Sequence, residues 1–68
     1  MSEKNYQIDF LLEQENGSAG WYRFNASIIP EILDTSTYEK RKEIFYMLVK
    51  DYMDNNNIEG EVRKIESK

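Results

Sequence analysis

The chain has 68 residues and a net charge of −4, and it contains neither cysteine nor histidine. These absences exclude disulfides, thiolate zinc sites and triads built on Ser-His or Cys-His. A domain of this length buries only about 60% of the surface of its unfolded chain, so its core is thin and self-association would support it. The acidic balance disfavours nucleic acid, because phosphate contacts depend on Lys and Arg.

Two stretches of alternating apolar and polar residues flank a turn in the N-terminal half. Residues 6–13 and 21–28 alternate throughout, which is typical of half-buried strands. Residues 15–20 between them contain an Asn-Gly dipeptide, a strong turn signal. The pattern predicts a β-hairpin with one mixed face and one apolar face, the latter carrying Tyr6, Ile8, Phe10, Leu12, Tyr22, Phe24, Ala26 and Ile28.

Two helical segments are expected after the hairpin. Pro30 ends the second strand and suits the first position of a short helical turn, whose Ile32 and Leu33 we expect to close one end of the core. A long helix is predicted from about Thr37 to Asn55, opened by a capping box of Ser36 and Glu39. At the helical period its inward face carries Tyr38, Phe45, Leu48, Val49 and Tyr52, with Met53 at the edge.

The C-terminal segment 58–65 predicts a third, weaker strand. Ile58 and Val62 alternate with charged residues, whereas Ile65 is out of phase. A β-bulge at Gly60 would reset this phase. Two asparagines after Asp54 suit the left-handed C-cap that separates the helix from this strand.

These elements predict one α+β domain over residues 1–68, ordered from about 5 to 65. We expect a three-stranded antiparallel sheet in the order 2-1-3, with the long helix packed on one face. Parallel pairing of the third strand beside the second is the alternative. No apolar run is long enough to span a membrane, and the polar residues 1–5 do not resemble a signal peptide. A cytoplasmic location is therefore predicted.

No catalytic, metal-ligating or cofactor-binding residues are predicted. No glycine opens a helix, so there is no phosphate-binding loop. Carboxylate pairs such as Glu59 with Glu61 and Glu13 with Glu15 are expected to be solvated, because a small sheet has little room for a cleft that shifts a pKa. The acidic and amide residues at 51–59 lack the spacing of a calcium-binding loop. The chain is expected not to be an enzyme.

The open face of the sheet is the first candidate binding surface. It is expected to be mostly polar, but it carries Leu11, Trp21 and Arg23. Trp and Arg are enriched where protein partners bind tightly. The competing interpretation is that Trp21 folds over the sheet edge and covers Leu11.

The outer side of the long helix is the alternative candidate, through Ile44 and Met47. Exposed Met adapts to different partners, and helix-on-helix packing here would form a homodimer. The edge of the second strand, where Arg23 is the one charged residue, is a third seam for a partner or a second copy.

The predicted function is that of a non-enzymatic protein–protein interaction module, acting as an accessory regulator or inhibitor of a larger partner. Single-stranded nucleic-acid binding through the open sheet face is one alternative, and a structural homo-oligomer is another. The short, acidic, cysteine-free composition is common among small accessory proteins of bacteria and their phages.

Overall fold

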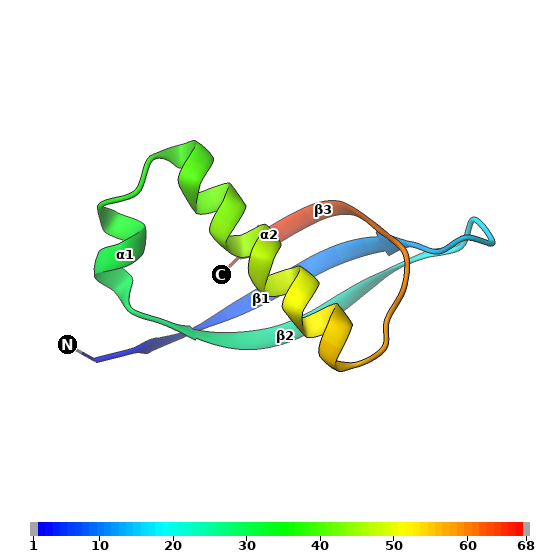
Figure 1. The fold of residues 1–68 in the computed structure, drawn as a ribbon, viewed down its shortest axis with the longest axis horizontal. Helices are drawn as coiled ribbons and strands as arrows, with labels where there is room; N and C mark the ends of the chain where they lie inside the picture. Colours follow the sequence, from blue (N-terminus) through cyan, green and yellow to red (C-terminus); the bar gives the residue numbers. More distant parts are fainter. Residues whose placement is uncertain (1, 68) are drawn as a thin grey trace.

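The computed structural model describes residues 2–67, and Figure 1 shows one long helix lying across a three-stranded sheet. The sheet contains β1 (Lys4–Glu13), β2 (Ala19–Ile28) and β3 (Glu61–Ser67), while α1 (Pro30–Asp34) and α2 (Tyr38–Asn55) lie between β2 and β3. β1 pairs antiparallel with both neighbours, in the order β2-β1-β3. The predicted fold class and strand order are confirmed, and the parallel alternative is wrong. The outermost strand residues extend slightly beyond the predicted ordered range of 5–65.

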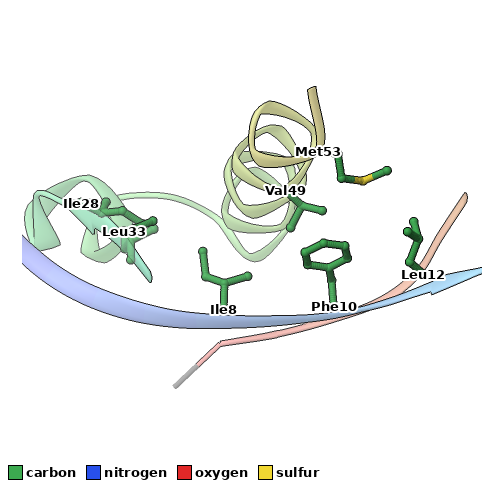
Figure 2. Packing of buried hydrophobic residues seen from close by; sticks show 8 residues of the cluster. Ile8, Phe10, Leu12, Ile28, Leu33, Val49 and Met53 are labelled. Carbon is green, nitrogen blue, oxygen red and sulfur yellow. The ribbon is translucent and has the colours of Figure 1, made fainter. Parts of the chain in front are cut away.

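The buried face of β1 is the centre of the core. Ile8, Phe10 and Leu12 alternate along this strand and are fully buried. Figure 2 shows Val49 of α2 pointing toward Phe10, and Met53 on the same side of β1 as these side chains. Removing these apolar surfaces from water is the main force that holds the helix on the sheet.

The residues around α1 close one end of the core, as predicted for Leu33. Leu33 is buried beside Ile28 (Figure 2). Ile32, which was expected to join it, instead leaves 47% of its surface exposed. A helix of five residues presents only a narrow stripe to the core, so Leu33 fills that stripe and Ile32 points away.

Four aromatic rings extend the core from β1 toward β2. Phe10 stacks on Tyr22 with ring centroids 5.3 Å apart and meets Phe24 edge-on at 6.0 Å. Tyr52 of α2 stacks on Phe24 at 4.4 Å and meets Phe10 edge-on. Offset-stacked and edge-on pairs are the favoured geometries of aromatic side chains, so this cluster joins α2 to both hairpin strands.

The start of α2 differs from the prediction. The N-cap is Thr37, whose hydroxyl accepts a hydrogen bond from the Lys40 amide at 3.1 Å. Ser36 instead donates its hydroxyl to the Ile32 carbonyl of α1, so the predicted capping box of Ser36 and Glu39 is wrong. Both residue types favour N-caps, and the nearby carbonyl of α1 decides between them.

Tyr38 was expected on the inward face of α2, but it is 65% exposed. Figure 1 shows α2 crossing the sheet obliquely, so that its first turn lies beyond the strands. The Tyr38 ring lies under the Lys42 ammonium, 4.7 Å from the ring centroid. The ring therefore has a cation instead of the core as its neighbour.

The third strand begins later than predicted, because residues 56–58 cap the helix. Asn56 is the C-cap with a φ of −109°, and Asn57 after it adopts a φ of 54°, so an asparagine does take the left-handed conformation at the helix end. The Ile58 amide donates a 2.9 Å hydrogen bond to the Met53 carbonyl. Ile58 thus belongs to the helix end, and β3 starts at Glu61.

A β-bulge does reset the phase of β3, but not at Gly60. Leu11 faces Lys64 while Leu12 faces Val62, which leaves Arg63 as the extra residue. Val62 and Ile65 therefore pair beside Leu12 and Phe10, on the helix side of the sheet. The bulge places both apolar residues of β3 on one face, although they are three positions apart.

We predict that Leu12→Ala lowers the free energy of unfolding by about 2–5 kcal/mol, because it leaves a cavity in the core. Leu11→Ala is the matched control, since Leu11 is only half-buried and lies on the opposite face. Urea denaturation followed by circular dichroism measures both losses. Equal losses for the two variants would contradict the placement of the core.

We predict that Gly60→Ala lowers the free energy of unfolding by about 1–3 kcal/mol. Gly60 has a φ of 145°, and an added Cβ would lie 2.7 Å from the Glu13 carbonyl oxygen. Gly20→Ala is the control, because nothing lies within 4 Å of its added Cβ. Thermal unfolding should show a lower midpoint for the first variant and no loss for the second.

Candidate functional site

The open face of the sheet brings Leu11 and Trp21 together, as predicted. They are direct cross-strand partners, and Lys64 of β3 faces Leu11 from the other side. Trp21 leaves 52% of its surface exposed, and Leu11 is half-buried. Trp21 therefore keeps a large accessible surface beside the half-buried Leu11.

Arg23 is on the same face, but its guanidinium is already engaged. Its Nε lies 2.9 Å from Oδ1 of Asp9, and its Nη2 lies 3.4 Å from Oδ2. The hydrogen bond to Asp9, together with the attraction between the two charges, raises the pKa of Arg23 above its usual value. Asp9 is buried, so Arg23 neutralises it. This fork-shaped pair is a structural feature of the sheet.

Ion pairs occupy much of the remaining open face. Arg63 Nη2 lies 2.7 Å from Glu13, and its Nη1 lies 3.4 Å from Glu61. These carboxylates raise the pKa of Arg63, chiefly through the hydrogen bond to Glu13. Lys64 pairs with Glu66 at 3.6 Å. A face of compensated charges is typical of a solvated sheet surface, and Leu11 and Trp21 form a small apolar island in it.

The two residues predicted on the outer side of the helix are separated by the structure. Met47 is 69% exposed, whereas Ile44 is half-buried and packs against the core. Tyr46, not Ile44, is the exposed apolar neighbour of Met47. The exposed apolar surface of this part of the helix is therefore formed by Tyr46 and Met47, on the side of the helix that faces β3, and not by Ile44 and Met47 as predicted.

A groove lies between α2 and β3. Its volume is about 620 Å³. Apolar side chains from both elements form most of its lining, and charged residues of both signs also contribute. The apolar residues are Phe45, Tyr46, Met47, Val62 and Ile65, and the charged ones are Glu39, Lys42, Glu43, Arg63 and Lys64.

The position of α2 explains why this groove is open. The helix contacts β1 through Val49 and Met53 and β2 through Tyr52. These contacts bury the face of β1 more completely than that of β3. Val62 and Ile65 are only half-buried, although their cross-strand neighbours on β1 are fully buried. The apolar face of β3 is therefore one part of the core that lacks a complete cover.

The groove was not predicted from the sequence, although Met47 was singled out. Two signals pointed to it. One was Ile65, whose phase conflicted with that of Val62, and the other was the outward position of Met47 on the helix. Both signals indicate a groove only once the bulge at Arg63 is known, because the bulge places Val62 and Ile65 on the helix side of the sheet.

The charged side chains offer little chemistry beyond ion pairing. Residues 2–67 contain no group of three or more acidic residues placed to hold a metal ion. The carboxylates of Glu13 and Glu61 converge, but on the guanidinium of Arg63. Within the same residues, neither helix is long and apolar enough to cross a membrane. The site best supported by geometry is thus an apolar binding groove.

Comparisons with models of protein families, with curated proteins and with solved structures found no match to this chain.

We predict that the fluorescence of Trp21, the one tryptophan of the chain, reports a half-exposed ring. Acrylamide should quench the folded protein roughly half as strongly as the urea-unfolded chain, because 52% of the surface of Trp21 is accessible. Quenching that is nearly absent in the folded state would show that Trp21 is covered and would contradict the open-face geometry.

Proposed function

We propose that this chain is a non-enzymatic protein-binding module whose ligand is an apolar segment of a partner protein, held in the groove between α2 and β3. The observation that carries the proposal is the apolar groove of about 620 Å³ beside the exposed side chain of Met47. Its volume lies within the range of about 300–1,000 Å³ that is usual for sites binding small ligands.

The composition of the groove indicates the chemistry of the partner. Its apolar walls favour a segment that inserts aliphatic or aromatic side chains. Among its charged lining residues, Lys42 pairs with Glu39, and Glu43 pairs with Lys40 outside the groove. These pairs are exposed and are worth little on their own, so a partner with charges of either sign can exchange them for new ones.

The side chains of the groove suit a surface that adapts to its ligand. Met47 is unbranched and polarizable, and such side chains repack around different partners at small cost. Tyr46 presents a large rigid ring with few rotatable bonds, a type of residue that anchors many interfaces. Phe45, Val62 and Ile65 are half-buried and would lose further exposed apolar surface when the groove is filled.

A module of this kind acts by occupying a surface of its partner. We propose the role of an accessory regulator or inhibitor of a larger, cytoplasmic protein. The net charge of −4 supports partners whose contact surface is neutral or basic. The absence of cysteine and histidine from the sequence supports a function without nucleophilic catalysis.

Single-stranded nucleic-acid binding through the open face remains the alternative. Trp21 supplies one ring for base stacking. The cations of that face are paired, with Arg23 bound to Asp9 and Arg63 bound to Glu13. A strand of phosphates would have to displace those carboxylates, so we favour the groove.

We predict that peptides selected on the full chain from a displayed random library are rich in apolar and aromatic residues and depend on Met47. Met47→Asp should weaken their binding by about tenfold or more, because it places a charge in the apolar groove. Trp21→Ala is the control on the opposite face and should leave binding unchanged. Isothermal titration with the selected peptides measures both effects.

Two results would contradict this proposal. One is the recovery of no peptide whose affinity depends on Met47, with both variants shown to be folded by circular dichroism. The other is binding of a single-stranded oligonucleotide at low salt that is lost in Trp21→Ala, which would support the nucleic-acid alternative.

A further inference from the structure

The two outer strands of the sheet are protected very differently against pairing with another strand. β3 is short, contains a bulge and carries four charged residues, Glu61, Arg63, Lys64 and Glu66. Short length, bulges and charges are the usual means of blocking strand addition at an edge. β2 has ten residues, pairs with β1 without a register shift and carries one charge, that of Arg23. The edge of β2 lacks these protections.

The core is also incompletely covered along β2. Phe10, at the centre of the aromatic cluster, is fully buried. Tyr22, Phe24 and Tyr52 belong to the same cluster but are only half-buried. β1 lies on one side of β2, and no described strand pairs on the other side. The unpaired backbone of β2 therefore belongs to the same strand as the half-buried rings of Tyr22 and Phe24.

We infer that β2 is the seam of a homodimer, in which the β2 strands of two copies pair antiparallel and join the two sheets into one of six strands. A second copy provides both things that the edge lacks, namely a strand for its backbone groups and apolar rings for its aromatic flank. This inference concerns a surface apart from the α2–β3 groove.

Charge and facing direction select the register. Directly opposite residues in a sheet point to the same face. When two copies of β2 pair, this condition holds only if the two-fold axis passes through one residue, which then lies opposite its own copy. An axis at Arg23 would oppose two guanidinium groups. An axis at Tyr22 pairs only residues 19–25 of β2, and an axis at Asn25 pairs only residues 22–28. An axis at Phe24 pairs residues 20–28, the longest overlap without opposed like charges.

The register centred on Phe24 also places suitable neighbours opposite one another. Phe24 meets Phe24 of the second copy on the helix face, and Tyr22 meets the small Ala26. On the open face, Arg23 lies opposite the exposed, uncharged Asn25. The grooves between α2 and β3 stay open at the two far edges of the six-stranded sheet. The dimer would therefore present two equivalent grooves, and a partner with two binding segments would gain avidity.

Substitutions at Asn25 test this register, because each copy places Asn25 opposite Arg23 of the other. Asn25→Lys should raise the dimer dissociation constant by about threefold to tenfold through like-charge opposition, and Asn25→Asp should lower it by a similar factor. Gln14→Lys and Gln14→Asp make the same charge changes in the turn, outside residues 20–28, and should leave the constant unchanged. Sedimentation equilibrium from micromolar to millimolar concentration measures all five proteins.

Amide hydrogen exchange at low and high concentration identifies the strand that pairs. The amides of β2 that point away from β1 should gain protection as the concentration rises, while those of β3 should not. The inference is overturned if the wild type and Asn25→Asp are both monomeric at millimolar concentration. It is also overturned if both Asn25 variants shift the constant in the same direction, or if β3 gains the protection.

Discussion

One helix has to cover a sheet of three strands, and its width allows it to cover only part of that sheet. α2 lies over β1 and β2, where Val49 and Met53 contact the buried face of β1 and Tyr52 stacks on Phe24. The consequence is a well-buried centre and two incompletely covered flanks. The groove beside β3 and the half-exposed aromatic rings beside β2 are both results of this single constraint.

The elements with strong local signals were predictable from the sequence. Strict alternation on both sides of the Asn-Gly turn predicted the hairpin, and its register brought Leu11 opposite Trp21 as expected. The same register places Asp9 opposite Arg23, but their ion pair was not predicted, because alternation says which face a residue occupies and not which charges meet. At the helix start, Ser36 and Thr37 are both good N-caps, and a tertiary contact with α1 decided between them.

The candidate groove depended on information that no single segment carries. A bulge is defined by the pairing of two strands, and β1 and β3 are separated by most of the chain. From the sequence alone, Ile65 was an apolar residue in the wrong phase and Met47 was an exposed side chain on a helix. Only the extra residue at Arg63, bound to Glu13 on the neighbouring strand, places Val62 and Ile65 opposite that helix.

The distribution of charge along the two edges is consistent with separate roles for them. The charges of β3 discourage strand pairing while they leave the apolar floor of the groove beside it accessible to side chains, so this edge suits a ligand recognised through its side chains. β2 has the opposite character, with free backbone groups and few charges, which suits recognition through the main chain by a strand of matching length. A thin core explains why neither flank is covered within one chain, since residues 2–67 provide one long helix for the sheet. Pairing through β2 would complete the aromatic flank and leave the groove free, so the two surfaces do not compete for the same side chains.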